Sequence, residues 1–323
     1  MKQITPRISG PVDVRGRLAE WGYRARGAFA PNTERALRAD SAAFSAWCMA
    51  SAVTALPATP DTIAAFLRAQ ADDGKAIATL RRRTATIARM HRAAGLPNPC
   101  DSETIRLTLR AIARAKGTQQ KQAAPLSRRD ADRIIDRIAA EGARLRDRRD
   151  VALMLVGRDL LARASELISI TVDAVEWIAE DAARIALRRH KTSTQPVWCR
   201  LGPDAATALR IWLEAAQITS GTVFRSVTKG GQVTNRALSV RDVGRIILSL
   251  TARAKLQGQS ARFSSHSLRV GMAIDLVAAS VESAAIMQAA GWKSARMLAH
   301  YTERLECDRG AIAKYYRLGA SNS

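Results

Sequence analysis

The stretch Ser265-His266-Ser267-Leu268-Arg269, followed by Gly291-Trp292 and then by Tyr301, contains the residues around which the rest of the chain is organised. His266 and Arg269 are three residues apart, so they share one face if the stretch is helical. Only two acidic residues lie between Ser265 and Tyr301. A concentration of hydrogen-bond donors with so few carboxylates indicates a site for an anionic group such as a phosphate.

The whole chain is strongly basic. Its 323 residues contain 51 Lys and Arg against 29 Asp and Glu, which gives a formal net charge of +22. The first 124 residues hold 20 of the basic and 9 of the acidic side chains, so both parts of the chain carry the same excess of +11. Such an excess points to a polyanion, most simply nucleic acid. Its even distribution predicts two basic lobes that grip one duplex.

The sequence also argues against several classes of protein. Cys48, Cys100, Cys199 and Cys307 lie far apart without a C-x-x-C spacing, so we expect neither a metal site nor a disulfide framework. The N-terminus lacks the apolar core of a signal peptide, and no run approaches the roughly 18 apolar residues of a membrane helix. We therefore expect a cytoplasmic protein without a membrane partner, a cofactor or a small-molecule substrate.

Length and composition predict two domains, because the chain exceeds the roughly 150 residues of a typical domain. Residues 1–30 mix Gly, Pro and Arg without a sustained period, which predicts a flexible arm that is either poorly ordered or loosely docked. Residues 118–126 are polar and end near Pro125, which predicts a linker. The expected parts are an N-terminal arm (1–30), a helical domain (31–117), the linker (118–126) and a second domain (127–323).

Apolar side chains recur at helical spacing through most of both domains, which predicts a mainly α fold. Helices are expected at about 32–48, 61–67, 75–94, 102–116, 127–141, 144–156, 203–217 and 239–255. The only convincing β pattern covers residues 183–187 and 197–201, on either side of a polar turn. We interpret it as a β-hairpin with Lys191 at its tip.

Two of the expected helices carry basic faces. In the helix at 75–94, three arginines lie opposite an apolar stripe, and no acidic residue occurs between Asp73 and Asp101. This composition favours a helix that lies on phosphates or in a major groove, although a solvated face on a core helix is the common alternative. The residues expected to bind DNA on the two helices are Arg82, Arg89, Arg92, Arg241 and Arg245.

Cleavage of a DNA phosphodiester without a metal requires a nucleophile, positive donors for the non-bridging oxygens and an acid for the leaving hydroxyl. The sequence offers a candidate for each. Arg163 and Arg269 can hold a phosphate bidentately, which lysine cannot do. Taken singly, each residue has an ordinary explanation; Arg163 with Glu166, for example, is the spacing of a common ion pair on a helix.

Taken together, the set resembles the catalytic residues of the tyrosine recombinase family, also called the phage integrase family. The match in identity, order and approximate spacing covers Arg163, Lys191, His266, Arg269, Trp292 and Tyr301. Trp47-Cys48 and residues 90–97 also resemble parts of the core-binding domain of the family. The resemblance implies a mainly α protein with a small β-hairpin or sheet, in which a helical core-binding domain and a catalytic domain form a two-domain DNA clamp.

The resemblance implies a role for each residue. Tyr301 would attack the scissile phosphate and form a 3′-phosphotyrosyl bond, which conserves the energy of the cut linkage, so that neither ATP nor a metal is needed. Arg163 and Arg269 would neutralise the developing charge. Lys191 would protonate the 5′-oxygen leaving group, and Glu166 would orient the site without contacting the substrate.

Two positions depart from the commonest pattern of the family. Many members have a second histidine directly after the H-x-x-R arginine and another where this chain has Trp292, but this chain has Val270 and Trp292. An indole N–H donates a hydrogen bond but does not exchange a proton at neutral pH. His266 and Trp292 would therefore both donate hydrogen bonds to the phosphate, and proton transfer would depend on Lys191 and His266.

The resemblance also implies partners. These are double-stranded DNA with inverted-repeat core sites and further copies of the chain, as a dimer on each site and a tetramer when two sites are paired, with a C-terminal helix within 303–318 docked on the neighbouring copy. The gene would be bacterial, phage-borne or plasmid-borne, and the protein associated with the nucleoid. Two alternatives remain open: a type IB topoisomerase-like DNA-relaxing enzyme, and a non-catalytic DNA-binding protein on the same scaffold.

Overall fold

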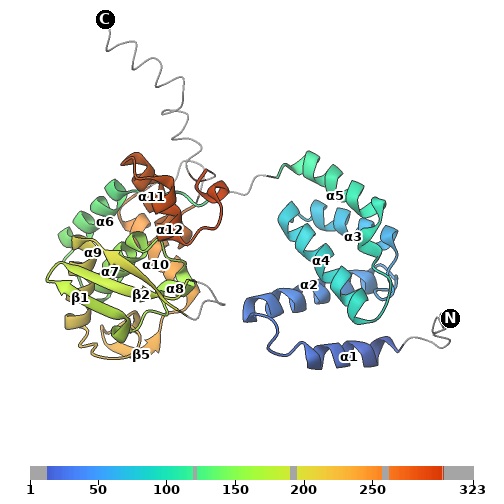
Figure 1. Cartoon of the computed structure of the whole chain (residues 1–323), viewed down its shortest axis with the longest axis horizontal. Coiled ribbons are helices and arrows are strands. Elements are labelled where there is room, and N and C mark those ends of the chain that lie inside the picture. The colour runs from blue at the N-terminus through green and yellow to red at the C-terminus, as the bar shows by residue number, and fades with distance from the viewer. Residues whose placement is uncertain (1–12, 119–121, 190–194, 257–261, 300, 302–323) are drawn as a thin grey trace, which may run out of the picture. The chain divides into compact units, whose positions relative to one another are not determined.

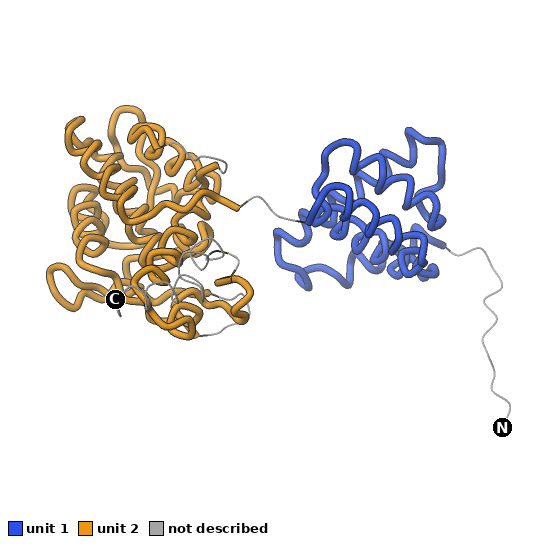
Figure 2. The backbone as a smooth tube through the Cα atoms, turned by 90° about the horizontal axis from the view of Figure 1, so that it is seen from above, with its two compact units in different colours: residues 1–120 blue, residues 121–323 orange. Residues whose placement is uncertain are grey.

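The computed structural model of the chain describes residues 13–118, 122–189, 195–256, 262–299 and 301. The chain divides into two units, Met1–Gln120 and Lys121–Ser323 (Figure 2). Each unit has its own cluster of buried apolar side chains. Because each cluster is drawn from one unit alone, the two are described separately.

The first unit is built from helices. They are α1 (Val14–Arg24), α2 (Pro31–Ala50), α3 (Pro60–Asp72), α4 (Ile77–Ala93), the short 3-10 helix η1 (Pro99–Asp101) and α5 (Glu103–Lys116). The Thr59 and Ser102 side chains accept hydrogen bonds from backbone N–H groups in the first turns of α3 and α5, which explains where these helices begin. The core includes Phe44 and Phe66, whose ring centroids lie 5.1 Å apart.

Helix α1 lies in the segment predicted to be a flexible arm, either poorly ordered or loosely docked. It lies within residues 1–30, begins after Asp13, whose side chain accepts a hydrogen bond from the Gly16 N–H, and packs against α4. No residue of α1 is buried. Because the helix has no fully buried face, its sequence has no sustained apolar period that would have revealed it. The rest of the predicted arm, residues 1–12, lies outside the described residues.

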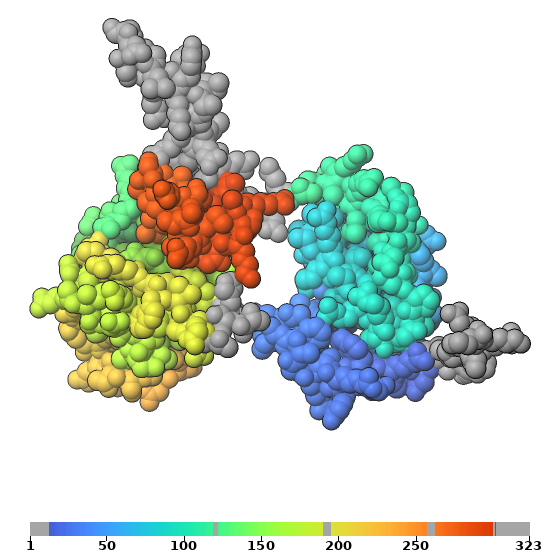
Figure 3. Space-filling model, in the orientation of Figure 1, coloured from blue at the N-terminus to red at the C-terminus, as the bar shows by residue number. Residues whose placement is uncertain are grey.

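The second unit is built around α7 (Leu145–Asp159). Residues 152–158 of α7 are buried, and α7 packs against α9 (Pro203–Ala215), α11 (His266–Ala278) and α10 (Val240–Arg253). The remaining helical elements are α6 (Arg128–Ala140), α8 (Ala164–Leu167), the 3-10 helix η2 (Val172–Ala174) and α12 (Ser283–Ala290). In the space-filling view, α11 and α12, coloured orange to red, form one contiguous part of the surface of this unit (Figure 3).

Two small antiparallel sheets complete the second unit. The strands β1 (Val175–Ala179), β2 (Ala182–Leu187) and β3 (Val197–Leu201) form one sheet in that order, beside α7 and α9 (Figure 1). The register Ile185↔Cys199 and Leu187↔Val197 confirms the predicted pairing of 183–187 with 197–201. Strands β4 (Arg225–Val227) and β5 (Val233–Ala237) form the second sheet. These and β1 were not predicted, because β1 is mostly exposed and β4 spans only three residues.

Part of the predicted linker belongs to the second unit. Leu126 is fully buried, and its N–H donates to the Ser267 carbonyl at 3.0 Å. The Leu126 backbone also lies so close to Gly271 of α11 that any side chain at position 271 would overlap with it. The linker prediction is therefore wrong for residues 122–126, because one buried leucine and its backbone hydrogen bonds outweigh the polar composition.

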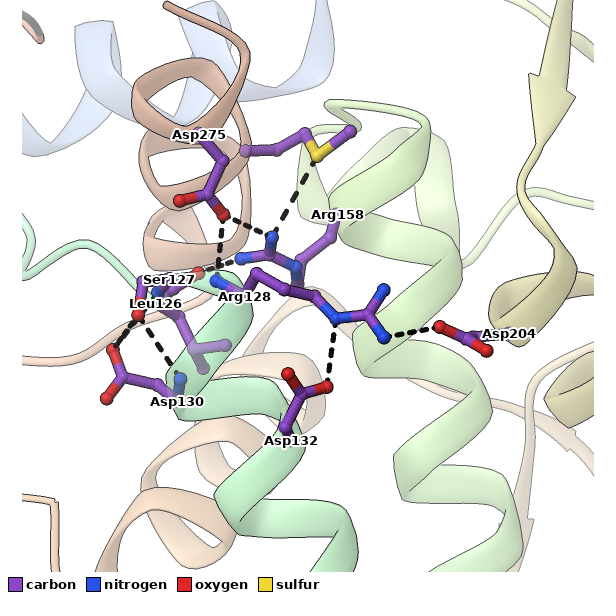
Figure 4. Close-up of polar contacts among 9 residues, drawn as sticks. Leu126, Ser127, Arg128, Asp130, Asp132, Arg158, Asp204 and Asp275 are labelled. Atoms are coloured by element: carbon purple, nitrogen blue, oxygen red, sulfur yellow. Dashed lines mark hydrogen bonds and ion pairs between the residues drawn. The ribbon is translucent and has the colours of Figure 1, made fainter. Parts of the chain in front are cut away.

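A polar network fixes α11 against α6 and α7 (Figure 4). Arg158 of α7 is buried, donates to the Leu126 carbonyl and forms an ion pair with Asp275 of α11 at 2.6 Å. Asp275 also accepts from the backbone N–H of Arg128 at 2.8 Å, at the start of α6. The Arg128 guanidinium pairs with Asp204 at 2.6 Å, at the start of α9. Four helices are thus tied together beside the helix that carries His266 and Arg269.

Two kinds of feature are absent from the described residues. No described helix is both long enough and apolar enough to cross a membrane. Within the same part of the chain, no three His, Cys, Asp or Glu side chains are grouped so that they could hold a metal ion.

Candidate active site

Tyr301 and His266 meet through a hydrogen bond. His266 opens α11, and its Nε2 lies 2.7 Å from the Tyr301 hydroxyl. Tyr301 is 7% exposed and belongs to a cluster of buried apolar side chains that includes Leu298 and Trp292. The Trp292 ring lies 5.4 Å from the Tyr301 ring between centroids. The aromatic ring of Tyr301 thus packs against apolar side chains, while its hydroxyl forms a hydrogen bond with the His266 imidazole.

Arg269 lies one turn further along α11 and is only 1% exposed. Its guanidinium donates to the Leu161 carbonyl, and also to the Ala290 carbonyl at 2.7 Å. The guanidinium carbon lies 5.0 Å from the centroid of the Trp292 ring, a cation–π distance. Arg269 therefore joins the turn that precedes Arg163 to the turn that precedes Trp292.

Both of these turns need unusual backbone conformations. Gly291 ends α12 with a φ of +64°, which glycine adopts without strain. Leu161 has a φ of +44°, the left-handed conformation that ends α7, and the following Ala162 N–H donates to the Gly157 carbonyl. Trp292 directly follows Gly291, and Arg163 lies two residues after Leu161, so a predicted site residue comes soon after each turn.

Arg163 and Glu166 form the ion pair that their spacing allows. Glu166 accepts a hydrogen bond from the Arg163 backbone N–H at 2.8 Å and forms an ion pair with the Arg163 guanidinium at 2.6 Å. Both contacts lie at the N-terminus of α8, where Arg163 is the capping residue. The two side chains differ in exposure, since that of Arg163 is 46% exposed and that of Glu166 only 7%. The carboxylate is thus an internal support, and the guanidinium remains accessible to a substrate.

Burial and the two arginines set the proton affinities of the site. Burial lowers the pKa of His266, and the positive charges of Arg269 and Arg163 lower it further. Burial raises the pKa of Tyr301, while the same two arginines oppose that rise. At neutral pH, the pair is therefore a neutral imidazole and a neutral phenol.

Six of the seven residues predicted for the site are thus placed within one unit: Arg163, Glu166, His266, Arg269, Trp292 and Tyr301. The seventh, Lys191, lies outside the described residues. Arg189, which the sequence analysis did not single out, lies 3.9 Å from Glu166 through Nη1. The signal that could have found it is strand alternation: Ile185 and Leu187 of β2 are buried, and Arg189 follows in the same phase.

The structure changes the interpretation of the arginines on α4. Arg82 forms an ion pair at 2.6 Å with Asp40 of α2, so the charge that seemed uncompensated along the sequence is compensated in space. The Arg89 guanidinium lies over the Phe29 ring at 4.7 Å. Arg92 is exposed. On α10, Arg241 and Arg245 are exposed, and Arg245 lies 3.8 Å from Asp242. DNA binding by these five arginines remains a prediction.

Comparison with known proteins gives the family. Residues 124–306, more than half of the chain, match the model of the phage integrase family. The chain belongs to this family. An integrase/recombinase XerD homolog of Selenomonas ruminantium is 32% identical over 287 residues, which cover 85% of this chain and 82% of the relative. The Cre recombinase of Escherichia phage P1 is 27% identical over 325 residues, 94% of each chain.

A solved structure supports the fold. The Tn1549 transposon integrase, in complex with transposon right end DNA, matches 92% of this chain and 98% of its own at a TM-score of 0.64 and 13% identity. At that identity, the likeness shows the fold alone. The predicted family and the mainly α fold with small antiparallel sheets are confirmed. Val270 and Trp292 are the residues that we associate with the Cre branch of the phage integrase family. The predicted clamp arrangement stays a prediction.

Proposed function

We propose that this phage integrase family member is a site-specific recombinase, which cleaves and rejoins DNA strands through a 3′-phosphotyrosyl intermediate at inverted-repeat core sites. The observation that carries the proposal is the 2.7 Å hydrogen bond between His266 Nε2 and the Tyr301 hydroxyl, in the field of Arg163 and Arg269. Family membership supports DNA cleavage and rejoining as the class of activity.

In the cleavage step, the Tyr301 oxygen attacks the scissile phosphorus. A new bond forms between that oxygen and phosphorus while the bond to the 5′-oxygen breaks. With its own proton on Nδ1, the neutral His266 accepts the phenolic proton at Nε2, over the distance at which the two atoms already lie. Lys191 supplies a proton to the departing 5′-oxygen, so charge does not accumulate on either side of the phosphate.

The arginines stabilise the charge that develops on the non-bridging oxygens. Arg163 is suited to direct contact, because its guanidinium is half exposed while Glu166 fixes one of its edges. Arg269 is buried, and two of its donors are bound to carbonyls, so it acts mainly as a fixed positive charge beside Tyr301. Trp292 packs between Arg269 and Tyr301 and holds both in place.

Rejoining reverses these steps with a different 5′-hydroxyl as the nucleophile. The phosphotyrosyl ester keeps the free energy of the cleaved diester, so the reaction proceeds without ATP, and the protein side chains supply all the proton transfers without a metal. Exchange between two sites requires several copies of the chain, for which we propose a dimer on each site and a tetramer in the paired complex. The net charge of +22 suits a duplex DNA substrate.

The test starts from DNA that the protein itself selects out of a pool of randomised inverted repeats. A selected duplex with a nick beside the cleavage position traps the covalent adduct, because the short strand released after cleavage diffuses away. We expect wild type to form a denaturation-resistant adduct, and Tyr301→Phe to bind the same duplex with similar affinity but form none. Absence of an adduct with wild type on a tightly bound site would overturn the proposal. Relaxation of supercoils on DNA that lacks paired sites would favour the topoisomerase alternative.

A further inference from the structure

Arg189 is a buried arginine in the second unit that the proposed reaction does not use. It follows β2 in the inward phase of Ile185 and Leu187, and its side chain is 2% exposed. Burial of a guanidinium costs free energy unless its donors are bound and its charge is paired. Yet its Nε and Nη1 are buried and have no hydrogen-bond partner among the residues that the structure describes. A buried charge in this state calls for a functional explanation.

The contacts of Arg189 lead to Arg163 by two routes. Its Nη2 donates to the Leu160 carbonyl at 2.6 Å, at the C-terminal end of α7, where the chain turns towards Arg163. Its Nη1 lies 3.9 Å from Glu166 Oε2, the same oxygen that accepts from the Arg163 backbone N–H at 2.8 Å. Arg189 thus holds both the backbone that leads to Arg163 and the carboxylate that orients it.

A third contact reaches the turn before Trp292. A side chain at Gly291 would come within 2.9 Å of Arg189 Cδ, so the stem of Arg189 packs directly on this glycine. Gly291 precedes Trp292, and its neighbour Ala290 accepts from Arg269. The turn before Arg163 and the turn before Trp292 therefore contact one buried side chain.

The groups around Glu166 carry a net positive charge. Arg163 and Arg189 approach the Glu166 carboxylate directly, and the charges of all three act on Arg269, so three guanidinium groups share one carboxylate. The cluster therefore carries a surplus of two positive charges. Such a surplus stabilises a dianionic phosphorane more than a phosphodiester that carries one charge.

We propose that Arg189 is a positioning residue of the active site, which orients Arg163 through Glu166 and adds a buried positive charge behind the scissile phosphate. This role rests on the proposed function. Arg189 does not touch the substrate. It holds Glu166 so that the exposed edge of the Arg163 guanidinium is presented to the non-bridging oxygens.

The test compares Arg189→Met, which removes the charge and the donors but keeps most of the volume, with Arg189→Lys, which keeps the charge. Arg149→Met is the matched control, because Arg149 is also a buried arginine of this unit but pairs with Asp150 and the Arg225 carbonyl. At a temperature at which all variants are folded, we expect adduct formation by Arg189→Met to be slowed about 100-fold, the cost of misplacing a catalytic group by about 1 Å. Arg189→Lys should recover part of the rate, and Arg149→Met should react like wild type.

A methylphosphonate at the scissile position separates this role from a purely structural one. The methyl group removes one negative charge from the reacting phosphate, so the reaction depends less on the positive cluster. The defect of Arg189→Met should shrink to about tenfold or less on this substrate. A defect of equal size on both substrates would overturn the role.

A double-mutant comparison adds an independent readout. Because Arg189 acts in part through Arg163, Arg189→Met should slow the Arg163→Lys variant by a clearly smaller factor than it slows wild type. Multiplication of the two separate defects would contradict the proposal.

A wild-type adduct together with an unimpaired Arg189→Met would overturn the role of Arg189 alone. Absence of the wild-type adduct would overturn the proposed function and this role with it.

Discussion

At the scale of single residues, the proposed reaction pairs a proton acceptor, His266, with a nucleophile, Tyr301, near the positive charges of Arg163 and Arg269. Burial keeps the Tyr301 pKa above its ordinary value, so phenolate is scarce at neutral pH and an acceptor is needed. His266 meets this need, because burial and the nearby arginines keep its imidazole neutral. One environment therefore keeps both partners in the protonation states from which the proposed transfer starts. The positive charges of Arg163 and Arg269, which oppose the rise of the Tyr301 pKa, are what favours the phenolate that the transfer produces.

This environment predicts how cleavage depends on pH. The His266 pKa is lowered from its ordinary value of 6.5, so the accepting form predominates at neutral pH and is lost only when the pH falls through that lowered pKa. The initial rate of adduct formation should therefore hold across neutral pH and decline only at a pH below the ordinary value of 6.5. His266→Gln should be about 100-fold slower or more at neutral pH and should lack this acid limb. An unchanged acid limb in His266→Gln would assign the titration to another group.

At the scale of elements, the site depends on how α11 is anchored. α11 starts at His266 and carries Arg269 one turn later. Asp275, near the other end of α11, forms an ion pair with Arg158 of α7 and accepts a hydrogen bond from the first turn of α6 (Figure 4). Arg158 is buried and cannot turn to solvent if its partner is lost. The anchor therefore contributes to the stability of the second unit and to the placement of His266 and Arg269, the two side chains of α11 that the proposed reaction uses.

Removal of this anchor has a measurable cost. Asp275→Ala should destabilise the protein by about 2–3 kcal/mol, because it leaves a buried guanidinium with fewer partners. The matched control is Asp132→Ala, since Asp132 pairs with Arg128 at 2.9 Å but both side chains are about half exposed. The control should cost about 0–1 kcal/mol. Urea unfolding of both variants measures the difference, and equal losses would show that the Asp275 network is not the anchor.

At the scale of the whole molecule, the chain is two separately built units. The core of the first includes Phe44, Phe66 and Leu80, and that of the second includes Leu153, Leu209 and Trp212. All the described residues of the candidate active site belong to the second unit. In the proposed function, the first unit contributes affinity for DNA, and chemistry belongs to the second.

Separate cores predict separate unfolding. Residues 1–120 and residues 121–323, expressed as two fragments, should each unfold cooperatively, at a temperature close to that of the matching transition in the intact chain. Differential scanning calorimetry of the three proteins measures this directly. One cooperative transition in the intact chain, with neither fragment folded, would show that the units depend on each other.

The sequence alone determined the helical class and the β2–β3 hairpin, and it predicted the candidate site residues, because apolar period, strand alternation and residue identity are local properties. It could not reveal α1, which buries no residue, or Asp40 as the partner of Arg82, because that contact joins residues 42 positions apart. Only the tertiary structure decided that the Tyr301 hydroxyl lies within hydrogen-bond distance of His266, and that the buried Arg189 lies next to the Glu166 carboxylate. Such contacts depend on how distant segments pack, which no local pattern encodes.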